Sequence, residues 1–484
     1  MTDPDLHNRS GSHPSRPPIA TYRWQLTTDA GFDAAAAAAP DLAALGISHL
    51  YLSPVAEATP GSTHGYDVVD PTRLRAELGG AEAFERLVAT AHRFGLGIVI
   101  DIVPNHMAAD AANPWWWDVL RLGRRSRWAA TFDVDWDPPK GQLRETVLVP
   151  VLGDHFGREL EAGELRIARG RGEGRLLVVR YHEHEFPVSP ATTAHLLERV
   201  AVRADDDVLG VAARVMARVE DQTADIGARD TDLRVAERTA LARLDDPAVA
   251  AAVDVELDEL AADHDRLEAL LEQQHHRLAR WRIGASELDY RRFFDVDTLV
   301  ATRTDDDATW ELLHRLPIQL VNAGAVDGLR VDHVDGLRDP AAHLGRLRKE
   351  VGDDPWLLVE KILRADEDLP EDWPVDGTTG YEVAELLGGW LTDPGGAAML
   401  SVAWRDLTGS GGGFEAMAIE CRRLVIDAGL AADVERVTDA LVEVCEGRRR
   451  HRDHARSDLR LALVEVAVHA PGYRSYVHPS GEPG

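Results

Sequence analysis

VDGLRVDHVD, residues 326–335, indicates a buried strand whose end carries a carboxylate, Asp332, two residues after Arg330. A second run of the same kind, WLLVEKIL at 356–363, carries Glu360. Apolar runs that alternate with helical stretches indicate a parallel sheet, and in a (β/α)8 barrel the catalytic groups gather at the carboxyl ends of the strands. An Asp and a Glu from neighbouring strand ends are the groups that a retaining glycosidase uses. Structural ion pairs are the alternative for either carboxylate taken alone.

The remaining sequence predicts an α/β fold, a (β/α)8 TIM-type barrel truncated after about six strands. Strands are predicted at residues 19–26, 47–54, 95–106, 326–335, 356–363 and 375–380, with amphipathic helices at 33–45 and 81–94. A long insertion separates the third and fourth strands, because loops at that rim tolerate additions. The predicted organisation is a disordered leader (1–18), barrel strands 1–3 (19–106), an inserted subdomain, β-rich and then helical to Arg280 (107–282), barrel strands 4–6 (283–380) and a helical segment with a tail (381–484).

Composition and charge narrow the class of protein. The 484 residues include 53 Lys and Arg against 83 Asp and Glu, a net charge of −30, and 44% of them are hydrophobic. That apolar content is ample for a large core, whereas the negative charge argues against nucleic acid and anionic membrane surfaces as partners. No apolar run approaches the roughly 18 residues of a membrane span, and the polar leader has no signal-peptide core. The sequence therefore predicts a cytoplasmic enzyme.

Metal and cofactor sites are not predicted. The run HEHE at 182–185 puts two histidines on one face of a strand. Because no further ligands cluster nearby, a solvated or substrate-side face is favoured over a metal site. Cys421 and Cys445 are the only cysteines in the sequence, and idle thiols are favoured over a disulfide. We expect neither a metal nor a cofactor.

The two strand-end carboxylates divide the chemistry between them. Asp332 is the predicted nucleophile, and Arg330 on the same face would hold its pKa down. Glu360 is the predicted general acid/base, and an apolar pocket would raise its pKa to about 6. Arg330 is also predicted to bind substrate. The alternative is that it forms only a structural salt bridge.

Several aromatic and polar residues are candidates for sugar contacts. His106 and His333 are candidates to bond sugar hydroxyls, with core histidines as the alternative. Tyr66 is a candidate to stack on a glucose ring and Asp67 to bind the hydroxyls beside it, although HGYD at 64–67 is also typical of a tight turn. The three tryptophans at 115–117 either line an outer subsite or pack in the core.

Three of these segments match motifs of a known family. Residues 101–106, 328–333 and 359–361 resemble three motif regions of the α-amylase family of glycoside hydrolases. A narrower resemblance, to the maltooligosyltrehalose synthases within that family, extends from residue 21 to residue 381. It rests on seven segments in the order of that family, TYRWQL (21–26), SHLYLSP (48–54), HGYD (64–67), NPWWWD (113–118), YRRFFD (290–295), VEKIL (359–363) and GTTGY (377–381).

The resemblance implies a reaction of trehalose biosynthesis. In it, an intramolecular transglucosylation converts the reducing-end α-1,4 bond of a maltooligosaccharide to an α,α-1,1 bond. The resemblance also implies substrate contacts by Tyr290, Arg292 and Lys361. The family has a third carboxylate on a later strand, and residues 381–484 contain no match to it. We therefore expect a C-terminally truncated chain that is not competent by itself. An α-glucan hydrolase or transferase and an inactive maltodextrin-binding remnant are the alternatives.

Overall fold

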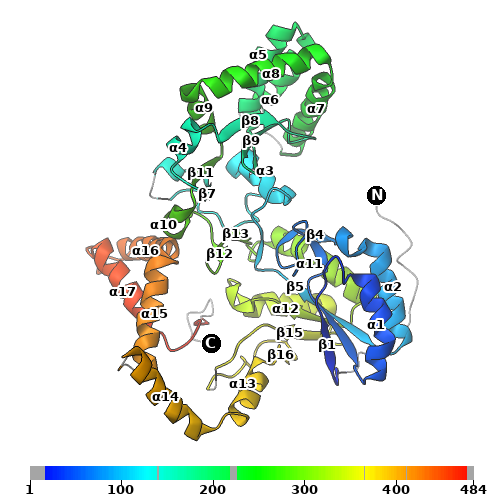
Figure 1. The fold of residues 1–484 in the computed structure, drawn as a ribbon, viewed down its shortest axis with the longest axis vertical. Coiled ribbons are helices and arrows are strands. Elements are labelled where there is room, and N and C mark those ends of the chain that lie inside the picture. Colours follow the sequence, from blue (N-terminus) through cyan, green and yellow to red (C-terminus); the bar gives the residue numbers. More distant parts are fainter. Residues whose placement is uncertain are drawn as a thin grey trace. The chain divides into compact units, whose positions relative to one another are not determined.

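The computed structural model describes residues 17–476, apart from 139–140, 219–225, 365, 410 and 412. The predicted leader, residues 1–18, therefore lies almost wholly outside the described residues. The chain divides into two compact units, unit 1 (Met1–Met107 with Thr302–Gly484) and unit 2 (Ala108–Ala301) (Figure 1). Within the described part of the chain, none of the helices has the length and apolar character that crossing a membrane requires.

Unit 1 is built around a parallel sheet (Figure 1). Its strand order is β1 (Thr21–Trp24), β2 (His49–Leu52), β5 (Gly97–Ile102), β14 (Gly328–Val331), β15 (Trp356–Val359) and β16 (Gly377–Thr378). Every neighbouring pair in this order runs parallel, and each predicted strand contains one of the observed strands. Parallel strands separated by helices fit a TIM-type fold, so this part of the predicted fold class is confirmed.

Helices between the strands supply the other half of the core of unit 1. They are α1 (Phe32–Ala44), α2 (Gly80–Arg93), α11 (Asp307–Asn322) and α12 (Pro340–Val351). In α2 the buried positions are Ala83, Phe84, Leu87 and Ala91, a spacing that places them on one helical face. Phe84 meets Phe32 of α1 edge to face with 5.2 Å between the ring centroids. The short strands β3 (Ala56–Ala58) and β4 (Val68–Leu74) form an antiparallel pair after β2.

Two buried histidines lie between α11 and α12. The ring of His314 stacks on Trp310 at 4.4 Å and lies 4.8 Å from the ring of His343. The Nδ1 of His314 bonds the carbonyl oxygen of Trp310 at 2.7 Å. Burial lowers the pKa of His314 to about 4, and burial with the charges of His314 and Arg346 lowers the pKa of His343. Both histidines are therefore neutral in the folded protein near neutral pH.

Because these two histidines are neutral when buried, we expect the free energy of unfolding to fall in mild acid. An unfolded histidine binds a proton below about pH 6.5, whereas the folded chain excludes it until the pH falls to about 4, so unfolding takes up protons between these values. We expect the free energy of unfolding to fall by roughly 3 kcal/mol for His314 alone across this window. Urea unfolding should show a shallower pH slope for His343→Leu than for the wild type. The exposed-site variant His451→Gln should keep the wild-type slope, and equal slopes in all three proteins would contradict the prediction.

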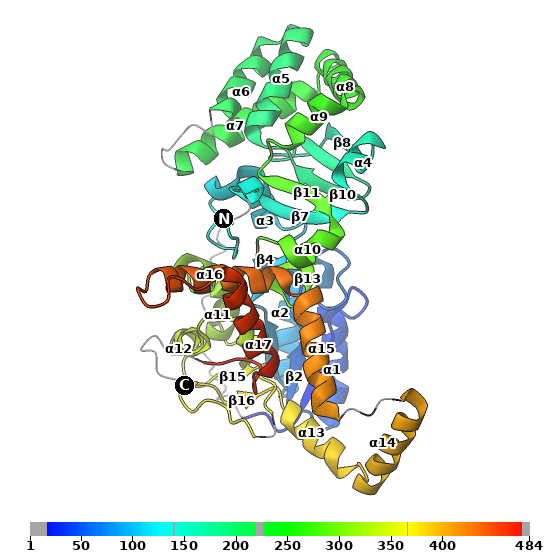
Figure 2. The same ribbon diagram turned by 90° about the vertical axis from the view of Figure 1, so that its left-hand side faces the viewer.

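Unit 2 combines short strands with a layer of helices that gathers to one side of them (Figure 2). Its strands are β7 (Val147–Leu152), β8 (Leu165–Arg169), β9 (Leu177–Tyr181), β10 (His184–Pro187), β11 (His276–Arg280), β12 (Arg292–Phe293) and β13 (Val296–Ala301). Its helices are α3 (Pro114–Leu122), α4 (Phe156–Glu161), α5 (Pro190–Ala204), α6 (Asp207–Ala217), α7 (Ile226–Leu244), α8 (Pro247–Ala262), α9 (His264–Leu271) and α10 (Gly284–Glu287). Strand β6 (His106–Ala108) contains the point where unit 1 ends and unit 2 begins, between Met107 and Ala108.

Unit 2 differs from the predicted insertion at its end. The sequence predicted helix up to Arg280, but residues 276–280 form β11, which pairs parallel with β7. That part of the prediction is wrong, because the helical pattern stops at α9. The unit also extends to Ala301 rather than to residue 282, since the backbone N–H of Ala109 donates to the carbonyl of Thr298 at 2.8 Å.

The residues after β16 form helices in the described part of the chain. These are α13 (Tyr381–Trp390), α14 (Pro394–Thr408), α15 (Phe414–Ala428), α16 (Ala431–Glu446) and α17 (Arg456–His469). A small core joins Ile426 to Val464 and Val468, whereas α13 and α14 bury no residue. Cys421 and Cys445 are free thiols, in agreement with the favoured prediction.

Candidate active site

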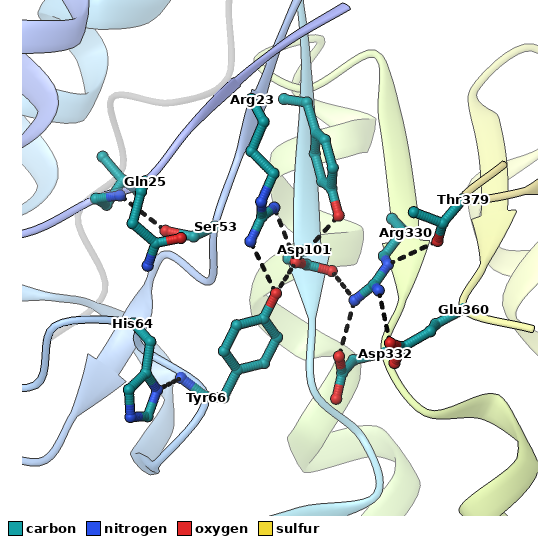
Figure 3. Close-up of polar contacts among 12 residues, drawn as sticks. Arg23, Gln25, Ser53, His64, Tyr66, Asp101, Arg330, Asp332, Glu360 and Thr379 are labelled. Carbon is teal, nitrogen blue, oxygen red and sulfur yellow. Dashed lines mark hydrogen bonds and ion pairs between the residues drawn. The ribbon is translucent and has the colours of Figure 1, made fainter. Parts of the chain in front are cut away.

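The carboxyl ends of β5, β14 and β15 bring acidic side chains together (Figure 3). Asp101 in β5 lies in register with Arg330 in β14. The backbone N–H of Asp332 donates to the carbonyl of Ile102 at 2.9 Å, and that of Glu360 donates to the carbonyl of Val331 at 2.8 Å. The sheet ladder therefore continues into the residues that carry the two carboxylates and fixes both at neighbouring strand ends.

The guanidinium of Arg330 joins the acidic side chains. Its Nη1 lies 2.7 Å from Asp101 Oδ1 and 2.8 Å from Asp332 Oδ1, and its Nη2 lies 3.2 Å from Glu360 Oε1. Its Nε donates to the hydroxyl of Thr379 at 3.2 Å. Because the Arg330 side chain is only 4% exposed, these partners must replace the water that would otherwise stabilise its positive charge. One cation thus holds Asp332 and Glu360 toward a common point.

The protonation of the two carboxylates differs from the prediction. Burial raises the pKa of Asp332 well above its ordinary value, and the charges of Asp101 and Glu360 raise it further. Burial also acts on Glu360, but Arg330, the backbone N–H of His333 and a hydrogen bond with Asp332 together lower its pKa. The sequence predicted the reverse, because it assigned Arg330 to Asp332 alone. Because the pKa of Asp332 is raised and that of Glu360 is lowered, the pair takes up its first proton on Asp332.

A strained backbone position follows the first carboxylate. His333 has a positive φ of 45°, a conformation that only a few per cent of non-glycine residues adopt, with Asn, Asp and His the most frequent among them. This conformation directs its backbone N–H to Glu360 Oε2 at 2.9 Å. A side chain on Gly336 would collide with His333 and with Asn105, so only glycine fits there. His106 is 1% exposed and its Nδ1 lies 3.3 Å from the Asn105 amide nitrogen, which favours the core-histidine alternative for His106.

The loop between β3 and β4 contributes Tyr66. Its hydroxyl donates to Asp101 Oδ2 at 2.5 Å, so the ring lies beside the acidic cluster. Asp67 accepts a hydrogen bond from the Ser62 hydroxyl at 2.5 Å and lies 3.8 Å from His64 Nδ1. The predicted tight turn is therefore present, and Asp67 is part of its hydrogen bonding.

Three residues of the cluster received no role from the sequence. They are Asp101, Tyr51 and Arg23, although all three lie within the quoted motifs. The Tyr51 hydroxyl donates to Asp101 Oδ2 at 3.2 Å, and Arg23 Nη1 lies 3.2 Å from the same oxygen. The available signal was Asp101 itself, a charge within the apolar run at 98–102, because a buried charge requires partners.

The residues implied by the family resemblance are all buried and already have polar partners. Tyr290 and Arg292 belong to unit 2, where they are 4% and 7% exposed. The Tyr290 hydroxyl donates to the carbonyl of Asp297 at 2.7 Å, and Arg292 forms an ion pair with the Asp297 carboxylate. Lys361 is 1% exposed, and its ammonium lies 3.3 Å from Asp335 and 2.5 Å from Glu367.

The other sequence candidates lie in unit 2. Trp115, Trp116 and Trp117 are all buried in α3, which favours core packing. His182 and His184 are both exposed, but the prediction that they share one face of a strand is wrong, because β9 ends at Tyr181 and His182 lies in the turn before β10. Among the described residues, no group of three or more His, Cys, Asp or Glu side chains is arranged to hold a metal ion.

Comparisons with known proteins agree with the motif resemblance. A family profile described as the catalytic domain of alpha amylase matches residues 40–142. A protein of Mycobacterium tuberculosis (strain ATCC 25618 / H37Rv), named as a maltooligosyl trehalose synthase, is 36% identical over 392 residues, which are 80% of this chain and 40% of that protein. The structure of maltooligosyltrehalose synthase from Arthrobacter ramosus has 33% identity and a TM-score of 0.71, and the match covers 95% of this chain and 48% of that chain.

A third match extends the pattern to an archaeal protein. The structure of a Sulfolobus tokodaii protein, titled as a hypothetical maltooligosyl trehalose synthase, has 28% identity and a TM-score of 0.67 over 96% of this chain and 49% of that chain. The chain thus carries α-amylase-type catalytic sequence. Within that class it is a relative of the maltooligosyltrehalose synthases, and the predicted resemblance is confirmed. It spans about 40% of the length of the curated relatives that it matches.

Proposed function

We propose that this chain supplies the catalytic carboxylate pair of a maltooligosyltrehalose synthase. The observation that carries the proposal is the shared guanidinium of Arg330, which contacts both Asp332 and Glu360 at neighbouring parallel strand ends. An aspartate and a glutamate so placed suit a double displacement at an anomeric carbon. The substrate is a maltooligosaccharide, and the reaction is an intramolecular transglucosylation.

In the first step, Asp332 attacks the anomeric carbon of the penultimate glucose. The bond from that carbon to the bridging oxygen breaks as Glu360 protonates the oxygen, leaving a glycosyl ester on Asp332 and a free glucose at the reducing end. In the second step, Glu360 takes the proton from the anomeric hydroxyl of that glucose. The hydroxyl oxygen attacks the ester carbon, an α,α-1,1 bond forms and the Asp332 carboxylate is released.

This mechanism requires a proton transfer within the carboxylate pair. In the free protein the first proton taken up by the pair goes to Asp332, because burial and the charges of Asp101 and Glu360 raise the pKa of Asp332. Attack requires Asp332 ionised and Glu360 protonated. A glycosidic oxygen beside Glu360 accepts a hydrogen bond only from the protonated carboxyl, so substrate binding draws the proton to Glu360.

Substrate contacts are proposed for residues around the pair. Tyr66 and His333 border the cluster through Asp101 and Glu360, so they are our first candidates to contact the reacting glucose. Asp67 and His106 are assigned to hold the Tyr66 loop and the 101–106 segment. Tyr290, Arg292 and Lys361 remain candidates from the family resemblance alone. The cytoplasmic location stays a prediction.

The test is incubation of maltopentaose with the natural polypeptide that carries these residues. We expect reducing ends to disappear without release of glucose, because the released glucose is rejoined through its own anomeric hydroxyl. Reducing ends are measured by a copper-reduction assay, and glucose by an enzymatic assay on the same samples. Release of glucose or shorter oligosaccharides would instead identify an α-glucan hydrolase or transferase. Calorimetric binding of maltopentaose without any conversion would identify a maltodextrin-binding protein.

A further inference from the structure

Arg23 is a cation beside the acidic cluster that the proposed mechanism does not use. It belongs to β1, at one end of the strand order, and its side chain is 35% exposed. Its Nη1 lies 3.2 Å from Asp101 Oδ2, and its Nη2 donates to the Tyr66 hydroxyl at 2.9 Å (Figure 3). Its Cζ lies 4.4 Å from the centroid of the Tyr51 ring. A planar guanidinium with two bonds and a stacking partner is held in one orientation.

Asp101 connects Arg23 to the reacting pair. Arg23 bonds Oδ2 of Asp101, whereas Arg330 bonds Oδ1. The two guanidinium groups face three carboxylates, so each cation compensates part of an excess of negative charge. Without Arg23, the Asp101 carboxylate would draw Arg330 toward itself, and Asp332 and Glu360 would lose part of their compensating charge.

The charged and titratable groups around this network come from several elements. Arg23 faces Tyr51 from β2, Tyr66 from the β3–β4 loop and Asp101 from β5. Those that face Asp332 are Asp101, Arg330 and Glu360. Those that face Glu360 are Arg330, Asp332, His333 and, from the segment after α17, Tyr473. Arg23 and Arg330 are the permanent cations in this set.

We propose that Arg23 is a positioning residue for the carboxylate pair: it neutralises Asp101, which leaves Arg330 to be shared by Asp332 and Glu360, and it fixes the Tyr66 hydroxyl. The inference rests on the proposed function for its role in catalysis, but its electrostatic part concerns this chain alone. Loss of the Arg23 charge leaves Arg330, among the described residues, as the one cation that contacts Asp101, Asp332 and Glu360, which disfavours ionisation of the pair. The apparent pKa of the pair therefore rises when Arg23 is made neutral.

The direct test measures protonation of the pair by infrared spectroscopy. Burial also raises the pKa of Asp118, so the signal of Asp332 is the protonated-carboxyl absorption of the wild type minus that of Asp332→Asn. In Arg23→Met we expect the titration midpoint to move upward by on the order of one pH unit. Arg23→Lys keeps the positive charge, so its midpoint should stay close to that of the wild type.

A matched control separates this local effect from a change of net charge. Arg86→Met removes one positive charge from an exposed ion pair with Asp33 on the helical surface of unit 1, and its midpoint should equal that of the wild type. An unchanged midpoint in Arg23→Met, or an equal shift in Arg86→Met, would overturn the inference. Circular dichroism of Arg23→Met and Arg23→Lys checks that both variants are folded. If the methionine variant is not, the maltopentaose Kd of Arg23→Lys still tests the positioning of Tyr66.

Maltopentaose binding provides the second readout. Because Lys cannot bond Tyr66 and Asp101 through a planar fork, we expect both Arg23→Met and Arg23→Lys to raise the Kd several-fold. Only Arg23→Met should move the titration midpoint. Wild-type Kd values in both variants would overturn the positioning of Tyr66. Failure of the wild type to bind maltopentaose, with the midpoint still shifted in Arg23→Met, would reject the proposed function and retain the electrostatic role of Arg23.

Discussion

Replacement of Asp332 by asparagine is expected to lower turnover of maltooligosaccharides by several orders of magnitude while leaving the fold intact. The amide has the shape of the carboxylate, and its oxygen can still accept the hydrogen bond from Arg330 Nη1. It is not an effective nucleophile, so the glycosyl ester does not form. The loss should appear in turnover rather than in binding, and calorimetry should give a maltopentaose Kd within a few-fold of the wild-type value.

The measurement is the loss of reducing ends under saturating maltopentaose, in the natural polypeptide that carries these residues. Asp33→Asn is the matched control, because Asp33 lies on α1 in an exposed ion pair with Arg86, and it should keep full turnover. Glu360→Gln should also lose turnover, since it cannot protonate the bridging oxygen. Substantial conversion by Asp332→Asn would assign the nucleophile to another residue.

The sequence predicted the strands of unit 1 and the acidic ends of two of them for a simple physical reason. Fully buried parallel strands are nearly continuous apolar runs, as residues 98–102 and 328–331 show, so a carboxylate at the end of such a run stands out. The positions of Asp332 and Glu360 depend on local chain direction. Both positions could therefore be predicted from the residues of each strand alone.

The charge state of the site was not accessible in that way. The pKa of Asp332 depends on Asp101, which is 231 positions earlier in the chain and adjacent only through the β5–β14 register. A reading of residues 330–332 alone assigns the Arg330 charge to one carboxylate and so inverts the two pKa shifts. The positive φ of His333 likewise accompanies a hydrogen bond from its backbone N–H to Glu360, 27 positions later, which local propensity does not encode.

The helix at 276–280 was predicted wrongly for a related reason. The segment HRLAR is short and rich in Arg, and it follows a long helical pattern, so its period does not distinguish strand from helix. Its pairing partner β7 lies more than a hundred residues earlier in the chain. Tyr290 and Arg292 illustrate the same limit. Their residue types suit sugar binding, but in unit 2 their polar atoms contact Asp297.

Replacement of Arg330 by methionine is expected to produce the largest loss of stability in unit 1. The side chain is 4% exposed and compensates Asp101, Asp332 and Glu360. Methionine fills much of the volume but leaves the carboxylates without this cation, and removal of one partner from a buried ionic network costs about 3–5 kcal/mol. Urea unfolding at neutral pH measures the loss. Arg86→Met removes an exposed charge, so its free energy of unfolding should stay close to that of the wild type.

The pH dependence of the Arg330→Met deficit identifies its cause. In the wild type, Arg330 contributes to the lowered pKa of Glu360 and opposes the burial that raises the pKa of Asp332. Without Arg330, burial and mutual repulsion raise the pKa of Glu360 above that of the unfolded chain and raise the pKa of Asp332 further. A carboxyl whose pKa is raised on folding loses stability as the pH rises through the folded value. The deficit relative to the wild type should therefore be largest near pH 8 and shrink toward pH 5, where the folded variant holds its protons. A deficit of constant size across this range would mean that lost packing, rather than uncompensated charge, destabilises the variant.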